Sequence, residues 1–295
     1  MNDSIEAPVA AHERSVQEYY DVMTKGFHLQ WNPDHIHMGV FEPGECPRHN
    51  EHMKDSTGLH CALERMIELV VAPAAIAEHH QVVDAGCGVG GTAIHLARTR
   101  GCKVTGVNLS RLHLELADRK VADAGLEGRV NFKYADCSRH LPFADASVDV
   151  LVNIESARHY SNRARFLREV RRILRPGGKI VASDWMARAS LRPEQYHKFI
   201  RPLSPAWALC DLESQATYTR LLRTNGLKVL EFDGFAGREL DNLQIIMNTY
   251  QSLRLLRHSG MRAPTLLNLI ARIEKLCNAW RNGYFDIRRY CAVKA

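Results

Sequence analysis

The chain has 295 residues, enough for one large domain or for one domain with a lid. Its 39 lysines and arginines against 33 acidic residues give a pI near 8.9, a bias too weak to indicate nucleic acid but suited to an anionic small substrate. The eight cysteines include no Cys-x-x-Cys pair, which argues against a disulfide framework or a zinc cluster. The first residues lack the order of a signal peptide, and no apolar run is long enough to span a bilayer. We therefore expect a cytoplasmic protein with a small-molecule substrate, no nucleic-acid partner and no membrane span.

Through the middle of the chain, short apolar runs alternate with helical patterns. The expected strands are 81–84, 102–107, 129–134, 148–153, 179–183, 227–232 and 284–293. The expected helices are 92–100, 111–124, 217–224, 243–256 and 266–280, with one more from the Ser161-Asn162 cap through Leu174. A turn at Pro176-Gly177-Gly178 should end that last helix. This alternation predicts an α/β fold with a doubly wound, mostly parallel, seven-stranded Rossmann-like sheet.

The flanking segments differ from this regular middle. Residues 1–75 are mostly helical in pattern and rich in histidine and aromatic residues, so we expect an N-terminal helical lid segment. Residues 76–295 should form the core, with lid insertions at about 185–215 and 235–283. Together these segments predict a covered pocket at the ends of the strands. The N-terminal arm could also pack on a second copy, giving a homo-oligomer.

The first strand runs into a turn of alternating glycines, and a helical pattern follows at once: Val82-Val83-Asp84-Ala85-Gly86-Cys87-Gly88-Val89-Gly90-Gly91. Glycine allows a backbone to bend through positive φ and lets a ligand lie against the main chain. A strand, a glycine turn and a helix N-terminus are typical of a nucleotide-binding corner. A nicotinamide-dependent reductase uses a similar turn, but it would place an acid about 20 residues further on, where this chain has Asn108.

Further motifs, in order and at the right spacing, narrow the prediction. They are Gly106-Val107-Asn108-Leu109-Ser110, Asn153-Ile154-Glu155-Ser156, Leu174-Arg175-Pro176-Gly177-Gly178 and, near the N-terminus, Tyr19-Tyr20-Asp21 and the run 31–39. With the glycine loop, these segments resemble the class I S-adenosylmethionine (SAM)-dependent methyltransferases. The likeness covers most of the chain and is nearest to the branch of tocopherol, sterol and prenyl-diphosphate C-methyltransferases.

The resemblance implies a SAM site along the strand ends, with S-adenosylhomocysteine as the product. The carboxylate of Asp84 could orient the glycine turn or the SAM ammonium group, and Asp136 could accept a hydrogen bond from the adenine amino group. A carboxylate that often binds the ribose is replaced by Asn108, so Asn108 and Ser110 are the candidates for that contact. The expected cofactor-binding residues are Asp84, Gly86, Gly88, Gly90, Asn108, Leu109, Ser110, Asp136, Cys137 and Asn153.

The acceptor is expected to be an alkene carbon of an isoprenoid or prenylated metabolite, methylated through a carbocation. Such a cation needs aromatic faces and a base, and the resemblance makes Glu155 the base or a substrate anchor, with His159 and Tyr20 as further catalytic candidates. Glu155 and His159 could share a helical face, and a structural hydrogen bond between them is the alternative. Arg158 could contact an anionic substrate. The expected substrate pocket comprises Tyr19, Trp31, His35, His37, Arg158, Trp185 and Trp207.

Several alternatives stay open. The same architecture serves N- and O-methyltransferases of secondary metabolites, and a nicotinamide reductase is the rival from another class. A nucleic-acid methyltransferase is disfavoured because Asn153-Ile154-Glu155-Ser156 is not of the Asn-Pro-Pro-Tyr type. The sequence His35-x-His37 beside Asp34 is suggestive of a metal, but we predict no metal ligand set. Magnesium is expected only if the substrate carries a diphosphate.

Overall fold

The computed structural model describes residues 3–43, 45, 57–235, 237–238, 242 and 263–295. Seven strands form one sheet in the order β3-β2-β1-β4-β5-β7-β6. They are β1 (Gln81–Ala85), β2 (Lys103–Asn108), β3 (Val130–Tyr134), β4 (Val148–Ile154), β5 (Leu174–Ala187), β6 (Leu227–Gly234) and β7 (Phe285–Lys294). The first five strands pair in parallel, and β7 runs antiparallel to both β5 and β6. The predicted doubly wound, mostly parallel methyltransferase-type sheet is confirmed.

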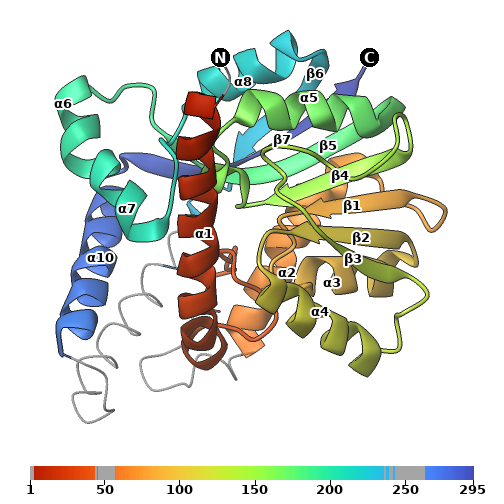
Figure 1. The fold of residues 1–295 in the computed structure, drawn as a ribbon, viewed down its shortest axis with the longest axis horizontal. Helices are drawn as coiled ribbons and strands as arrows, with labels where there is room; N and C mark the ends of the chain where they lie inside the picture. Colours follow the sequence, from red (N-terminus) through yellow and green to blue (C-terminus); the bar gives the residue numbers. More distant parts are fainter. Residues whose placement is uncertain (1–2, 44, 46–56, 236, 239–241, 243–262) are drawn as a thin grey trace.

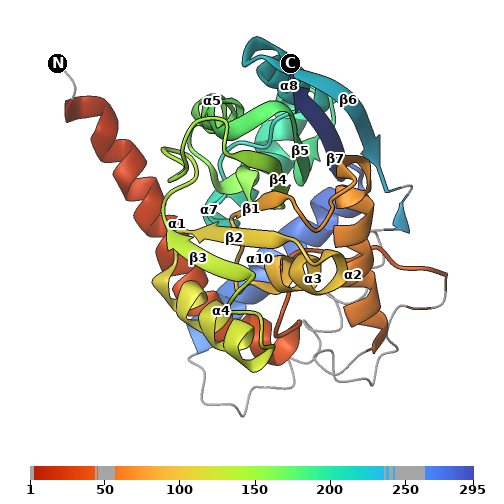
Figure 2. The same cartoon turned by 90° about the vertical axis from the view of Figure 1, so that its right-hand side faces the viewer.

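Helices cover both faces of the sheet (Figures 1 and 2). On one side lie α2 (Thr57–Val71), α3 (Gly91–Arg100) and α4 (Arg111–Asp123); on the other lie α5 (Arg163–Ile173) and α8 (Gln215–Thr224). The alternation of side chains along a strand explains the two layers. Val82 packs in the core with Leu63 of α2, whereas its neighbour Val83 packs in a second core with Phe166 of α5. A strand buried on both faces therefore needs the continuous apolar run seen in the sequence.

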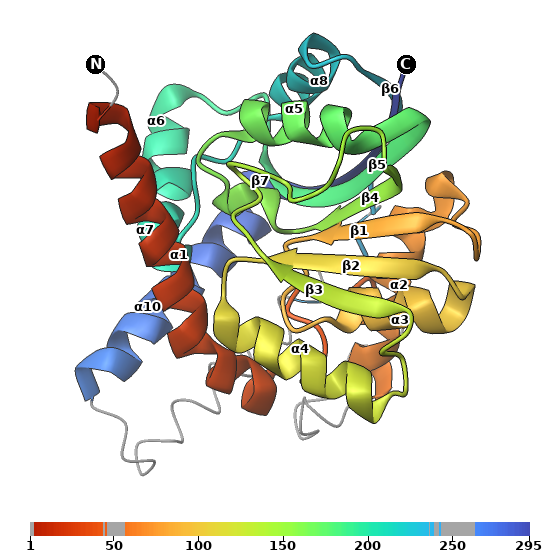
Figure 3. The same cartoon turned by 45° about the vertical axis from the view of Figure 1, so that its right-hand side comes forward.

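The remaining helices gather at one end of the sheet. The long helix α1 (Asp3–Gln30) crosses the carboxyl ends of β1 to β4 (Figures 1 and 3). On the same side lie the short helices α6 (Pro193–Gln195) and α7 (Ser204–Trp207), and α10 (Ala263–Arg281). Ligands of open α/β sheets bind at the carboxyl ends of the strands, so these helices are placed to cover a site. We propose to count α2 with the core, because it is buried against β4 and β5, and to keep α1 as the lid.

Four local predictions need correction or fall outside the described residues. The helix expected to include Leu174 ends at Ile173, and Leu174 begins β5 in an extended conformation. Residues 176–178 are an irregularity within β5, where the pairing with β4 shifts register, rather than a turn before the strand. Residues 185–187 of the expected first lid insertion belong to β5, and the expected helix 243–256 lies outside the described residues.

Within the part of the chain that the structure describes, none of the helices combines the length and the apolar character needed to cross a membrane. The seven cysteines that can be described are all free thiols.

Candidate active site

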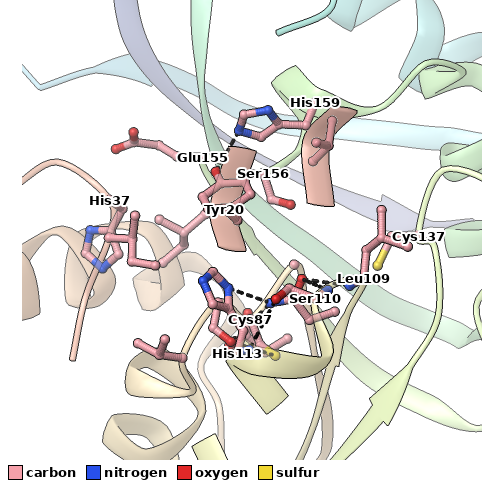
Figure 4. A pocket seen from close by; sticks show the side chains of 18 of the residues that line it. Tyr20, His37, Cys87, Leu109, Ser110, His113, Cys137, Glu155, Ser156 and His159 are labelled. Atoms are coloured by element: carbon pink, nitrogen blue, oxygen red, sulfur yellow. Dashed lines mark hydrogen bonds between the residues drawn. The ribbon is translucent and has the colours of Figure 1, made fainter. Parts of the chain in front are cut away.

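A pocket opens at the carboxyl ends of β1 to β4, beneath α1 (Figure 4). Helix α1 contributes one helical face to it, because its lining residues recur at helical spacing: His12, Val16, Gln17 and Tyr20. The predicted site residues that line the pocket are Asp84, Gly86, Gly88, Asn108, Leu109, Ser110, Asp136, Cys137, Glu155, Arg158, His159, Tyr20, His35 and His37. The fold thus brings together residues from the N-terminal segment and from four strand ends.

The glycine turn after β1 forms the floor of the pocket. Gly86 has a φ of +79°, and a Cβ built there would lie 1.8 Å from the Ser156 hydroxyl oxygen, so only glycine fits. At Gly88 the nearest side-chain atom to such a Cβ is 3.7 Å away, which leaves the space beside the backbone open. Gly90 does not line the pocket; its Cβ would lie 2.9 Å from Ala117, so this glycine allows close packing on α4.

Asp84 is the last residue but one of β1, directly before this turn, and is buried. Its Oδ2 has no hydrogen-bond partner among the described residues. Burial raises the pKa of this carboxyl from 3.8 to about 7, and a hydrogen bond from the backbone of Ala93 opposes the shift. An unpartnered buried carboxylate oxygen at this place suits a cationic ligand group such as the SAM ammonium. Asn153 is fully buried behind it and does not line the pocket, because its amide donates to the Ala85 carbonyl at 2.7 Å.

The residues after β2 are organised by Asn108. Its Oδ1 accepts the backbone N–H of Leu109 at 2.7 Å, and its Nδ2 donates to the Gly88 carbonyl at 3.1 Å. Ser110 caps α4 and donates its hydroxyl to Asp21 at 2.9 Å. The two ribose candidates therefore line the pocket but already make internal hydrogen bonds. Their role toward the ribose stays a prediction.

Asp136 follows β3 and lines the same end of the pocket as Cys137. Both of its oxygens accept hydrogen bonds from Ser138 at 2.9 Å, one from the backbone and one from the hydroxyl. Glu13 reaches this carboxylate from α1. Burial and the neighbouring Asp136 raise the pKa of Glu13 to about 7, so the two acids need not both carry a charge at neutral pH.

Glu155 is held by three donors in a strained position. Its φ is +50°, in the left-handed region that a non-glycine residue seldom adopts. Its Oε1 accepts the backbone N–H of Met38 at 2.9 Å, and its Oε2 accepts the Trp185 indole at 2.7 Å and the Arg158 guanidinium at 2.9 Å. The Arg158 guanidinium also lies 4.4 Å from the Trp185 ring centre. Arg158 is thus paired inside the protein with a buried carboxylate.

Tyr20 and His159 join the lid helix to the core (Figure 4). The Tyr20 hydroxyl lies 2.8 Å from Nε2 of His159, and the other nitrogen, Nδ1, lies 2.9 Å from the Ala208 carbonyl oxygen. Burial lowers the pKa of His159 well below its usual range. The imidazole is therefore neutral, donates from Nδ1 and accepts the tyrosine hydroxyl at Nε2. No Glu155–His159 hydrogen bond forms among these described residues, because His159 lies in a short 3-10 turn rather than one helical turn beyond Glu155.

The large aromatic residues predicted for the substrate pocket do not line it. Trp185 is on β5 and stacks on Phe285, with ring centres 5.2 Å apart. Trp31 is buried in the core and donates to the His37 carbonyl at 3.3 Å. Tyr19 and Trp207 contact each other edge to face, between α1 and α7. These four rings pack behind the residues that line the pocket.

Some lining residues were not predicted from the sequence. On α1 they are His12, Glu13, Val16 and Gln17, beside the predicted Tyr20; elsewhere they include Cys87, His113, Ser156 and Tyr160. His113 accepts from the Asn108 amide and contacts Thr24 of α1, so it links the loop after β2 to the lid. The helical spacing of residues 12, 16 and 20 was the signal that could have found the α1 face.

Comparison with known proteins gives the family. A methyltransferase-domain model matches residues 83–182. The methyltransferase GfsG of Streptomyces halstedii is 35% identical over 222 residues, which are 75% of this chain and 75% of that protein. This chain belongs to the class I SAM-dependent methyltransferases.

Other relatives of the methyltransferase extend this result. The O-methyltransferase resE of Aspergillus sclerotiorum is 32% identical over 198 residues, 67% of this chain and 70% of that protein. The geranyl diphosphate C-methyltransferase structure from Streptomyces coelicolor A3(2) covers 96% of this chain and 98% of its own, with a TM-score of 0.75 and 17% identity, which shows a shared fold alone. The predicted family, enzyme class and SAM cofactor are confirmed, and the reductase alternative is set aside.

The residues present fit the cofactor. The open backbone at Gly88, the glycine required at Gly86 and the unpartnered oxygen of Asp84 together provide a cradle for a cationic nucleoside. When bound, SAM supplies an electrophilic methyl group on a sulfonium. The chain must then position the acceptor, exclude water and accept any proton that the acceptor releases.

Proposed function

We propose that this methyltransferase transfers the methyl group of SAM to a hydroxyl or amine of a small, largely apolar natural product. The proposal rests on the hydrogen bonds that Glu155 already accepts within the protein. Methylation of an alkene carbon leaves a carbocation, which needs aromatic faces nearby and a base to remove a proton. Glu155, where the resemblance placed that base, already accepts from three donors, one of them the Arg158 cation.

The surroundings of the pocket support the same choice. Of the five rings expected to stabilise a cation, Tyr20 lines the pocket, whereas Tyr19, Trp31, Trp185 and Trp207 do not. The face of the Trp185 ring is already covered by the Arg158 guanidinium. Arg158 and Trp185 are engaged with Glu155 and with each other, so this ring face is not available to a substrate cation.

The names of relatives point in the same direction. They include O-methyltransferase resE, a tocopherol O-methyltransferase of Arabidopsis thaliana and a norajmaline N-methyltransferase of Rauvolfia serpentina. All three act on heteroatoms. In this chain, the strand ends would hold the cofactor and α1 would close over the acceptor, excluding water.

Product analysis tests the proposal. The purified protein is incubated with SAM and a panel of phenols, secondary alcohols, amines and prenyl diphosphates, and the products are identified by mass spectrometry. We expect a gain of one methylene unit on oxygen or nitrogen. Gly86→Ala, whose Cβ would lie 1.8 Å from the Ser156 hydroxyl oxygen, is the variant expected to be inactive. Gly128→Ala, where a Cβ meets nothing within 4 Å, serves as the matched control. Methylation at carbon alone would overturn the proposal.

The isoprenoid C-methylation expected from the sequence stays a prediction that the same panel tests. Magnesium dependence is expected only for the diphosphate acceptors. Among the described residues, no group of three His, Cys, Asp or Glu side chains is placed to hold a metal ion. The cytoplasmic location and a homo-oligomeric state also stay predictions.

A further inference from the structure

Gln17 presents an accessible amide to the pocket from the lid helix α1. The residue lines the pocket and is half-buried. Neither the oxygen nor the nitrogen of its amide is a fully buried atom, and neither makes a hydrogen bond to a described residue. A side-chain amide offers one carbonyl oxygen as an acceptor and two N–H donors. The side chain is therefore available to bind a polar group of a ligand.

Contacts on both sides of Gln17 fix its place over the strand ends. Residues 13, 17 and 21 are spaced four apart, so they form one stripe along α1 with about 6 Å between neighbours. At one end of the stripe, Glu13 interacts with Asp136, after β3. At the other end, Asp21 accepts the hydroxyl of Ser110, after β2, at 2.9 Å. Gln17 lies midway, so it faces the ends of β2 and β3 where α1 crosses them (Figures 1 and 3).

The ribose of a bound nucleoside belongs in this part of the pocket. In nucleotide-binding α/β sheets, the residue at the end of the second strand, about 20 residues after the glycine turn, contacts the ribose hydroxyl groups. In this chain that residue is Asn108, the last residue of β2. The two hydroxyl groups of a ribose each donate one hydrogen bond and can accept others. They therefore need an acceptor near the end of β2.

The side chains at the end of β2 are already engaged. The Asn108 amide donates to the Gly88 carbonyl at 3.1 Å and to Nδ1 of His113 at 3.2 Å. Its oxygen accepts the backbone N–H of Leu109 at 2.7 Å. The Ser110 hydroxyl donates its hydrogen to α1 and accepts the backbone N–H of His113 at 3.2 Å. These two residues hold the loop and the lid together, so a ribose would have to displace contacts that the fold uses.

The acids on the β3 side of Gln17 are engaged as well. Both oxygens of Asp136 accept hydrogen bonds from Ser138 at 2.9 Å. Glu13 Oε1 is fully buried, and Oε2 lies 3.5 Å from the guanidinium of Arg139. Because Glu13 is one turn of α1 away from Gln17, it is the alternative that an experiment must separate from Gln17.

We infer that Gln17 binds the ribose of the cofactor through its side-chain amide. The inference goes beyond the proposed function, because it holds whichever atom of the acceptor is methylated. Gln17 belongs to α1, so the same contact links the cofactor to the lid. A bound cofactor then holds α1 against the strand ends, in addition to the hydrogen bonds from Tyr20 and Asp21.

Calorimetry with cofactor analogues tests the contact directly. Gln17→Met keeps the length and the helix propensity of the side chain but removes the amide, and Glu18→Ala, at the next and exposed position, is the matched control. The wild type and Glu18→Ala should bind the 2′-deoxy or the 3′-deoxy analogue of S-adenosylhomocysteine about 3- to 10-fold more weakly than the parent compound. Gln17→Met should bind the parent about 3- to 10-fold more weakly than the wild type does and should distinguish that analogue from it by less than about twofold.

Hydrogen exchange tests the link to the lid. At equal occupancy, S-adenosylhomocysteine should slow backbone amide exchange in α1 of the wild type and of Glu18→Ala, and should slow it less in Gln17→Met.

Two results would overturn the inference. One is a Gln17→Met variant that binds the parent compound as the wild type does, or that still distinguishes the analogues as the wild type does. The other is a loss of this discrimination in Glu13→Gln while Gln17→Met retains it, which would assign the contact to Glu13. Both results concern only the cofactor, so they leave the proposed transfer to oxygen or nitrogen intact, and product analysis decides that proposal separately.

Discussion

The strongest structural prediction concerns Glu155→Gln. Gln has one carbonyl oxygen in place of two carboxylate oxygens, yet the site contains three donors, from Met38, Trp185 and Arg158. If the amide oxygen faces the indole and guanidinium, the amide NH₂ opposes the Met38 N–H, and Arg158 keeps a buried charge without a counter-charge. Removing one partner of a buried ion pair costs about 3–5 kcal/mol. At about 2 °C per kcal/mol for a chain of this size, the melting temperature should fall by roughly 6–10 °C.

A double-mutant cycle measures the interaction between Glu155 and Arg158 separately from the other hydrogen bonds of Glu155. Arg158→Met keeps the apolar stem over Trp185 but removes the charge. In that background Glu155→Gln should lower the free energy of unfolding by only about 1–3 kcal/mol, because it leaves one buried donor unsatisfied. The coupling free energy, measured by urea denaturation, should be about 2 kcal/mol. A coupling within about 0.5 kcal/mol of zero would refute the view that Glu155 and Arg158 form a structural pair, and would return Glu155 to the list of candidate bases.

Three further predictions concern the cofactor end and the lid. Since the pKa of Asp84 rises from 3.8 unfolded to about 7 folded, its stabilising contribution is present at low pH and is lost as the pH rises through 7. In the absence of cofactor, the stability of Asp84→Asn relative to the wild type should therefore increase by about 2 kcal/mol between about pH 5.5 and 8.5. An equal difference at both pH values would contradict this. Gly86→Ala should abolish SAM binding by calorimetry, because its Cβ would lie 1.8 Å from the Ser156 hydroxyl oxygen; measurable binding would show that the turn can move. Tyr20→Phe leaves the buried His159 nitrogen without its donor, so hydrogen exchange in α1 should speed up and SAM affinity should fall about tenfold, at a cost of about 1–2 kcal/mol; unchanged exchange would mean that this bond does not hold the lid.

The sequence was sufficient to predict those elements of the fold whose determinants lie close together in the chain. The apolar run before Asp84 and the glycines after it predict a strand, a turn and a helix, because each requirement is met within ten residues of chain. The end of α5 shows the limit of the same reasoning. Leu174 stands at helical spacing after Val170, but Pro176 follows closely, and the chain turns extended at Leu174 to pair with Val148 of β4.

The pocket could be predicted by position but not by orientation. The strand-end motifs identified most of its lining, because parallel strands bring their carboxyl ends to one edge. The aromatic residues were placed wrongly as lining because the side that a ring faces depends on distant pairing. Trp185 faces Phe285 only because β5 pairs antiparallel with β7, about a hundred residues further on. Likewise, nothing local to Tyr20 indicates that it meets His159, 139 residues away.

The arrangement of charge in the pocket explains why Glu155 and Arg158 are paired and why the backbone of Glu155 is strained. A sulfonium cofactor brings positive charge into a poorly solvated space, where an isolated carboxylate would bind it tightly and an isolated guanidinium would repel it. Glu155 and Arg158 neutralise each other, so the pair can fix the backbone around Met38 without adding a net charge. The left-handed backbone at Glu155 then has a structural reason: it places one carboxylate where it accepts from the indole, the guanidinium and the Met38 N–H at once.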